Sequence, residues 1–479
     1  MSKTGKRTIV SLMVVVMFAL AAAMIIGYAA ETVAETNSVT AVLNSGAKDE
    51  IVGLISQRRS DYSEKISSVF RQNGLTTAST LSTSEAFYAV TEKRSMVIKD
   101  FDGSYAYLYM ELLPSGYAIY DIAKSELLES ADVGSGPYEG YSDGSALYYG
   151  GPGNYYVKNG STYTDISGGG SVGSEAAEYF AQRMDEVRQR LAQDEVVSAT
   201  NAGVSVAAAN SSTLHLLGEE SNISTLCDDA MYYFLLLYGL EAGIFDSSQE
   251  GWICSYYDFQ SEFGNGGSDL VFANNIYGSC TTVAMGIVLQ YYERLGLADT
   301  VPSDISGFHN MYDPKVKDPD VKLSQISRSS AVAEYLHQEL LYEIFPEYRN
   351  TPSSSLTSTT FGLSLYDMRY AIEDYFAEFS LPSYSVTHNL LWLGGPEGKI
   401  VKGNPVILGF EGAYEDASGN GGTVGAHSVV AYAYTTTKVG IIDSLDDFMV
   451  NFGWYDGNYG QIYIDKSIVD NNVYFNIMS

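Results

Sequence analysis

The stretch Gly278–Gly296, GSCTTVAMGIVLQYYERLG, decides how the second half of this chain is interpreted. After two small residues and the thiol of Cys280, the sequence is apolar on every side for about three turns, which is typical of a buried helix. A thiol in the first turn faces unpaired backbone N–H groups and the positive end of the helix dipole, which together stabilise a thiolate. The stretch therefore predicts a nucleophile mounted on a buried central helix.

Two residues far downstream complete a candidate site. His427 opens the strand-like run HSVVAYAY and Asn451 lies in VNFGW, so the order along the chain is Cys, His, Asn. The chain has five His, and this one follows the Cys by 427 − 280 = 147 residues. Papain-type enzymes place His and Asn about 130 to 150 residues beyond the Cys. Asn451 lies somewhat further, at 451 − 280 = 171. Because a lone buried Cys is usually a core residue, the prediction rests on the conjunction of the three.

These motifs resemble bacterial papain-fold cysteine peptidases of the streptopain type. GSCTTVAMGIVLQYYERLG resembles the active-site helix of that family, and HSVVAYAY with VNFGWYDGNYGQIYI resembles its His strand and its later tryptophan hairpin. The resemblance covers roughly residues 258–479 and extends more distantly to bacteriocin-leader peptidases. Phe452 stands where the family has its first Trp, and Tyr455 with Asp456 follow Trp454 in place of Gly, which leaves the shape of this hairpin open.

The resemblance implies a role for each residue. Cys280 as a thiolate attacks the substrate carbonyl, His427 takes the thiol proton and passes it to the leaving amine, and Asn451 orients the His ring. Asp443, in GIIDS, is the alternative orienting residue, since a carboxylate also stabilises an imidazolium. The family places a Gln six residues before the Cys as an oxyanion donor; here that position is Asn274, followed by another Asn.

Other chemistries have less support. The run GGSVG at Gly169–Gly173 matches the Ser-elbow pattern, but no strand precedes it. HExxH, paired CxxC and calcium-loop patterns are absent, and Asp313, Asp318 and Asp320 lack calcium-loop spacing, so we expect no cofactor and no metal. Two alternatives stay open: a cell-wall amidase or transglutaminase-like acyl transferase with the same Cys and His, and a catalytically inactive surface protein on the same fold.

The N-terminus predicts export. Lys3, Lys6 and Arg7 precede an apolar stretch from Ile9 to Ala30, which is typical of a signal peptide and is also long enough to be an uncleaved signal anchor. We therefore expect the bulk of the chain to be extracellular or at the cell surface of a bacterium.

Charge and cysteine content narrow the partners. With 58 acidic and 27 basic residues the formal net charge is −31, which disfavours nucleic acid and anionic membranes. The expected partner is a protein or peptide substrate, with membrane contact only through an uncleaved N-terminal segment. Of the three Cys, Cys280 is left over if Cys227 pairs with Cys254; two buried thiols are an equal alternative.

The chain is predicted to be α+β, with a papain-like two-lobed catalytic domain after a helix and an antiparallel β region. The expected regions are 1–30, signal peptide or anchor; 31–195, propeptide-like; 196–257, linker and connecting helix; and 258–479, peptidase domain. If the N-terminal region is a propeptide, the low-charge stretch Val196–Thr213 is where it is cut; an independent surface or adhesion module is the alternative.

Periodicity predicts the individual elements. One or two helices are expected at 47–73, further helices at 174–193, within Gly278–Gly296, at 329–345 and around 365–379, and an antiparallel β region at 87–164. Strands are expected later at PVILGF, HSVVAYAY, KVGIID, DFMVNF and QIYI.

Overall fold

The structure is a computed structural model that describes residues 46–72, 89–132, 134–142, 144–166, 171–201, 212–217, 220, 280–294, 372–373, 375–377, 380–381, 385–389, 395–410, 413–415, 421–423, 427–439, 442–452 and 462–476. All contacts discussed below lie within the unit Ile51–Ser479. Several predictions fall outside the described residues: the export segment, Cys227 and Cys254, Asn274, the aspartates at 313, 318 and 320, and the helix 329–345.

The first half of the chain forms the helix and antiparallel strands that its sequence predicts. Helix α2 is followed by short aromatic strands with glycine turns between them. At one of these turns Gly116 has φ +101°, and a Cβ there would lie 2.2 Å from the carbonyl oxygen of Ala131, so only glycine fits. The elements are α2 Ala47–Gln72, β1 Thr91–Lys99, β2 Tyr105–Leu113, β3 Tyr117–Asp121, β4 Glu126–Ala131, β5 Leu147–Tyr149, β6 Tyr155–Asn159, β7 Thr162–Asp165 and β8 Ser171–Val172.

Helix α4, Ser174–Asn201, runs past its predicted end at Gln193. One face, with Phe180, Met184, Val187 and Leu191 at helical spacing, is buried. Residues 196–201 continue the helix, and Ser212–Leu216 forms strand β9, which pairs with β14. The prediction of an irregular linker over Val196–Thr213 is therefore wrong at both ends, because helix propagation and strand pairing extend into it; its middle lies outside the described residues.

The second half contributes helix α7 and most of the remaining strands. The run KVGIID is not one strand as predicted, because β14 ends at Val439 and β15 begins at Ile442, so the run crosses from one strand to the next. The other four predicted strands are confirmed, and residues 372–373 and 375–377 are helical as expected. The elements are α7 Cys280–Arg294, β10 Ser385–Asn389, α10 Pro396–Ile400, β11 Val406–Phe410, β12 Ala413–Glu415, β13 Gly421–Thr423, β14 His427–Val439, β15 Ile442–Asn451, β16 Ile462–Asp465, η9 Lys466–Ile468 and β17 Asn471–Asn476.

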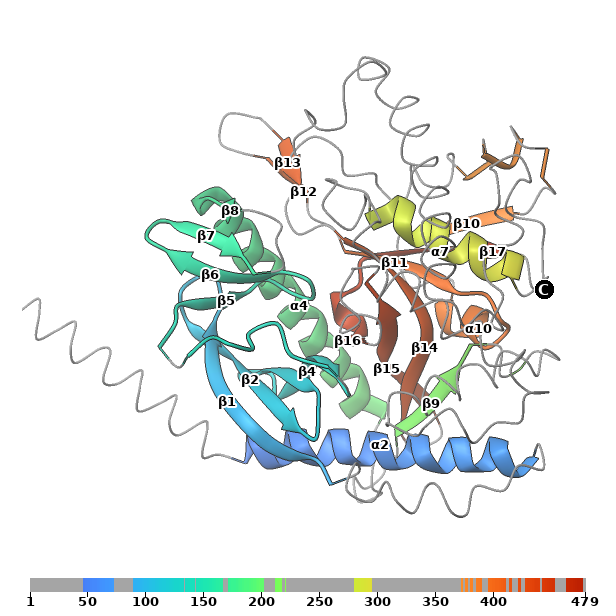
Figure 1. Ribbon diagram of the computed structural model, residues 1–479, viewed down its shortest axis with the longest axis horizontal. Helices are drawn as coiled ribbons and strands as arrows, with labels where there is room; N and C mark the ends of the chain where they lie inside the picture. The colour runs from blue at the N-terminus through green and yellow to red at the C-terminus, as the bar shows by residue number, and fades with distance from the viewer. Residues whose placement is uncertain are drawn as a thin grey trace, which may run out of the picture. The chain divides into compact units, whose positions relative to one another are not determined.

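One mostly antiparallel sheet joins the two halves (Figure 1). Its order is β10-β17-β11-β14-β15-β16-β4-β3-β2-β1-β5-β6-β7-β8, with β9 added on β14. The halves meet where β16 pairs with β4, with Tyr463 opposite Ser130 and Ile464 opposite Glu129. The fold is thus broadly α+β, while the papain-like two-lobed arrangement stays a prediction.

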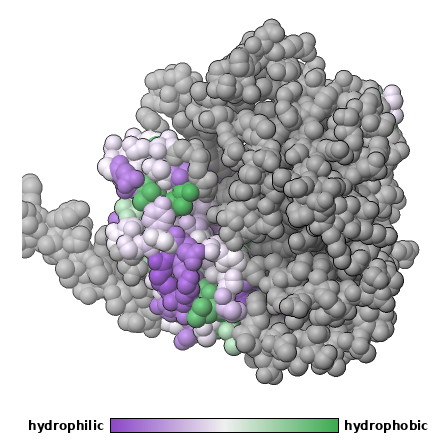
Figure 2. Space-filling model, in the orientation of Figure 1, coloured by the Kyte–Doolittle hydropathy of each residue, from purple (hydrophilic) through white to green (hydrophobic). Residues whose placement is uncertain are grey.

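The surface of the described residues is largely polar. Only three large hydrophobic side chains among them are exposed, Leu54, Tyr105 and Leu113. Figure 2 accordingly shows a hydrophilic face with small separate apolar spots over the coloured part of the molecule. None of the helices among these residues combines the length and low charge that crossing a bilayer requires.

Candidate active site

Helix α7 begins at Cys280, as the sequence predicts, and its apolar residues are in the core. Ala284, Met285, Val288 and Leu289 are buried, which follows from a sequence that is apolar around the helix. Near its other end the Tyr292 hydroxyl donates a 3.0 Å hydrogen bond to the side-chain oxygen of the buried Asn404. The helix is thereby held at both ends, and its first turn packs on the start of β14.

The Cys280 thiol lies beside the first residues of β14. The Thr281 and Ser428 hydroxyl oxygens are 2.9 Å apart and both residues are buried. The partly buried Cys280 sulfur has hydrogen bonds with the backbone N–H and the hydroxyl of each of these two residues. Burial nevertheless raises the pKa of the Cys280 thiol above its ordinary value, and these hydrogen bonds lower it only in part. The donors at the helix start thus act in the expected direction, but desolvation outweighs them.

His427 is held by the backbone after β15. Its Nε2 lies 3.1 Å from the carbonyl oxygen of Phe452. A carbonyl only accepts, so Nε2 carries the proton and Nδ1 has the lone pair. The ring lies near the Phe410 and Phe452 rings, with centroids at 6.4 Å and 5.3 Å. Burial lowers the pKa of His427 to about 4, although the bond to Phe452 favours the charged form. The imidazole is therefore neutral at neutral pH.

The two candidate orienting residues lie at opposite ends of β15. Asn451 is buried at the end near His427 and pairs in register with Val430 of β14. Asp443 pairs with Lys438, and 438 − 427 = 11 positions along β14 correspond to roughly 35 Å from His427. In this structure the ring N–H is bonded by the Phe452 carbonyl, one residue beyond Asn451. Of the two candidates, Asn451 is therefore the one that lies at the same end of the sheet as His427. The hydrogen bond from the His427 ring is accepted by the carbonyl of the next residue, Phe452.

The structure places the Cys280 thiol against Ser428 and Thr281. Within the described residues, the partners of the Cys280 sulfur are Ser428 and Thr281. Successive side chains of a strand point to opposite faces, so contact with Ser428 does not by itself place its neighbour against the sulfur. The thiol therefore lies at the second residue of the strand that His427 opens, and the His427 ring is bonded to the Phe452 carbonyl.

Sequence reasoning missed Ser428, Thr281 and the Phe452 carbonyl. Thr281 follows Cys280 and Ser428 follows His427, so both hydroxyls stand beside predicted site residues. Period-two alternation shows that one of two adjacent strand residues faces a packed helix, but the register of β14 decides which one. The Phe452 carbonyl carries no side-chain signal at all.

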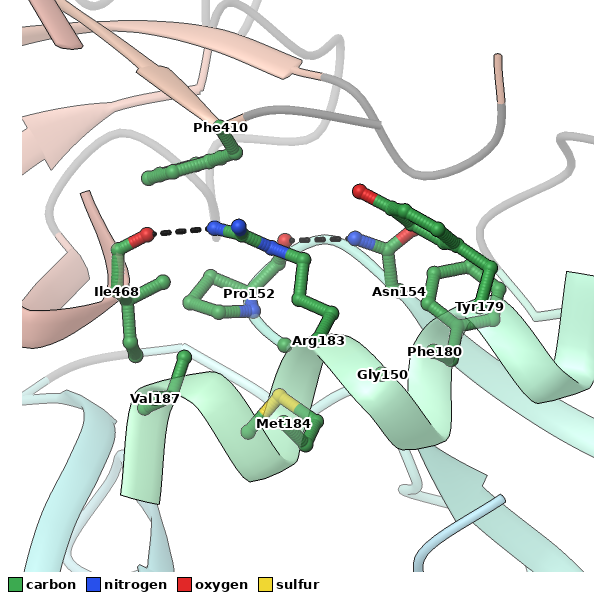
Figure 3. A pocket seen from close by; sticks show the side chains of 11 residues that line it. Gly150, Pro152, Asn154, Tyr179, Phe180, Arg183, Met184, Val187, Phe410 and Ile468 are labelled. Atoms are coloured by element: carbon green, nitrogen blue, oxygen red, sulfur yellow. Dashed lines mark hydrogen bonds between the residues drawn. The ribbon is translucent and has the colours of Figure 1, made fainter. Parts of the chain in front are cut away.

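A small pocket lies next to this region, between α4, the β5–β6 turn and the end of β11 (Figure 3). Figure 3 shows the Arg183 guanidinium reaching from α4 to the carbonyl of Ile468, with the Phe410 ring across the pocket. That hydrogen bond is 2.7 Å long, and Arg183 also forms an ion pair with Asp470. Phe410 is the register partner of His427. The pocket is thus lined both by residues of the first half of the chain and by Phe410 of β11, the strand that pairs with the start of β14.

Comparisons with known proteins add little. No protein-family model and no curated protein matches the chain. Among solved structures it is similar to a fragment of Prevotella intermedia prointerpain A with a cysteine-to-alanine substitution. The identity is 10% over 80% of this chain and 97% of that chain, and the TM-score is 0.33. A likeness at this level carries no argument about fold or activity.

Proposed function

We propose that the chain is a secreted or cell-surface cysteine peptidase that hydrolyses peptide bonds with Cys280 as nucleophile and His427 as general base. One observation carries the proposal: the first turn of a buried helix, beginning with Cys280, packs on the first residues of the strand that His427 opens. Nucleophile and base on separate elements that meet at their ends is the arrangement that nucleophilic acyl transfer needs.

The tautomer of His427 suits the role of base. With the Nε2 proton donated to the Phe452 carbonyl, Nδ1 carries the lone pair of the ring and is the atom that would take the thiol proton. The thiolate then attacks the substrate carbonyl, and the imidazolium gives its Nδ1 proton to the leaving amine, which departs with it. Water, deprotonated by the same Nδ1, hydrolyses the thioester and restores the thiol.

We further propose that the described chain is the latent precursor. Burial raises the pKa of the thiol and lowers that of His427 to about 4, so both shifts disfavour the thiolate–imidazolium pair. An active pair requires the His427 ring to turn toward the sulfur and its surroundings to become more polar. The contacts of α4 with Ile468 and Asp470, and the pocket that includes Phe410, support a role of the N-terminal half in holding the latent state.

Substitution of the pair tests the activity. Cys280→Ala and His427→Ala are each expected to lower casein hydrolysis by several orders of magnitude, to nearly the same floor, because the two residues act as one unit. His215→Ala is the matched control, since His215 lies on β9, stacked on Tyr434, and is expected to keep wild-type activity. Hydrolysis by Cys280→Ala at the wild-type rate would refute the proposal. Cleavage of peptidoglycan in place of casein would move the assignment to an amidase.

Processing tests the latency. Full-length Cys280→Ala should accumulate uncleaved, and added active enzyme should trim it. Proteases cut accessible segments first, and Val196–Asn201 is helical while Ser212–Leu216 is a paired strand, so we expect the cut within Val196–Thr213 but outside these two elements. N-terminal sequencing of the active species decides the question: a start near Glu31 would mean that the N-terminal region is a permanent domain.

A further inference from the structure

Two hydroxyl groups lie at the Cys280 sulfur, and the proposed chemistry uses neither of them. Thr281 and Ser428 come from different elements, α7 and β14, and their oxygens are 2.9 Å apart. Both residues are almost completely buried, at 1% and 5% exposure, so neither hydroxyl is simply hydrated. A buried hydroxyl without hydrogen bonds is costly, and the position of this pair against the thiol gives each group a partner.

The direction of the hydrogen bonds follows from the number of protons. The two backbone N–H groups that reach the sulfur can only donate. Each hydroxyl has one proton, so if Ser428 donates to the sulfur, Thr281 can donate to the Ser428 oxygen. The reverse order, in which Ser428 donates to Thr281 and Thr281 to the sulfur, satisfies the same groups, and either order is a short relay of two hydroxyls to Cys280. Every donor in it stabilises negative charge on sulfur, and bonds to a charged acceptor are roughly twice as strong as neutral ones.

We propose that the paired hydroxyls of Ser428 and Thr281 hold the Cys280 sulfur in its thiolate form, one donating a hydrogen bond to the sulfur and the other holding its partner in the orientation to do so. This inference rests on the proposed function, because it assigns a purpose to the thiolate. In the proton transfer to His427 Nδ1, the electron pair of the S–H bond stays on sulfur, where the hydroxyl pair and the two backbone N–H groups bind it. Ser428 and Thr281 are thus positioning residues for the nucleophile, and they offset part of the cost of placing a charge in a buried site.

The test measures the titration of the thiol itself. Full-length protein is titrated by the ultraviolet absorbance of the thiolate, with Cys280→Ala as the blank. Alkylation of Cys280 by iodoacetamide is followed across the same pH range by mass spectrometry of its peptide, which separates it from the other two Cys. Ser428→Ala should raise the titration midpoint by about one pH unit and slow alkylation at neutral pH about tenfold.

Conservative variants separate hydrogen bonding from packing. Ser428→Thr keeps the hydroxyl and should restore the midpoint, whereas Thr281→Val, which has a similar volume but no hydroxyl, should raise it as Ser428→Ala does. A folded Ser428→Ala protein with an unchanged midpoint would overturn the proposal, as would Ser428→Thr that titrates like Ser428→Ala. Because the titration needs no turnover, it can support the hydrogen bond even if casein hydrolysis fails, so the two proposals fail separately.

Discussion

The junction between the two halves of the sheet contains a cluster of carboxyl groups whose ionisation should destabilise the fold. Asp447 of β15 and Asp465 of β16 are directly opposite each other, an unfavourable pairing for two negative charges. Burial raises the pKa of Asp465 to about 7, and the charge of Asp447 adds to this. The groups that interact electrostatically within the cluster are Glu126, Asp446, Asp447, Asp465, Asp132, Lys466 and Arg58.

The change Asp465→Asn removes one of these charges and keeps the local structure. The side-chain oxygen of Asp465 accepts a 2.7 Å hydrogen bond from the backbone N–H of Ser467, and Asn offers the same oxygen. The folded pKa of about 7 lies roughly three units above the ordinary value of 3.8. At about 1.36 kcal/mol per unit, the ionised group costs the folded state up to about 4 kcal/mol.

The sign of the pH dependence follows from the raised pKa. Below about pH 4 the carboxyl is protonated in both states, so its contribution to stability is fully present. Between about pH 4 and pH 7 the unfolded state loses the proton while the folded state keeps it, so stability is lost as pH rises; above pH 7 the loss levels off. The Asn variant should therefore match the parent near pH 4 and be about 2 to 4 kcal/mol more stable at pH 8.

Urea unfolding at pH 4, 6 and 8 measures this difference, with both proteins in the Cys280→Ala background to prevent self-cleavage. Asp185→Asn is the matched control, because it makes the same substitution at an exposed carboxylate of α4 outside the cluster. A stability difference between Asp465→Asn and its parent that is the same at all three pH values would refute the reasoning.

Two further predictions concern a buried ion pair and the orienting residue. Asp132→Ala should destabilise the protein by about 3 to 5 kcal/mol in urea unfolding, because it leaves the buried Arg58, 2.7 Å away, and Arg59 without their carboxylate; a loss below about 1 kcal/mol would contradict this. Asn451→Ala should lower peptidase activity on the order of tenfold to a thousandfold by disturbing the segment that holds His427, while Asp443→Ala should keep activity because of its distance. A folded but inactive Asp443→Ala with an unaffected Asn451→Ala would reverse the assignment.

Local patterns predicted the elements with clear periodicity. The amphipathic spacing of α2, the apolar run of α7 and the aromatic segment of β2 each match an element in the structure. Prediction failed where a local pattern was ambiguous. KVGIID has a strand-like composition, yet it crosses from β14 to β15, and the end of α4 continues through residues that have weak helical signals.

For the candidate site, too, the sequence predicted some features and only the structure decided others. The sequence predicted a Cys at a helix start, and it favoured Asn451 over Asp443 as the orienting residue only through the resemblance that VNFGW carries. The register of β14 with β15 separates them, because Asp443 is opposite Lys438, far from His427. The contact of Ser428 with the thiol likewise depends on how α7 packs on β14, which no spacing in the chain records.

The sequence by itself thus determined the local elements and the chemistry that is present: a helix-mounted thiol, a His at a strand start and many carboxyl groups. Only the tertiary structure decided the partners and the charge states. It brought β4 beside β16, and it placed Cys280, His427 and Asp465 where burial shifts their pKa values. The physical reason is the separation along the chain of the residues that interact. Periodicity is a property of neighbouring residues, whereas strand pairing and desolvation depend on residues brought together from hundreds of positions apart.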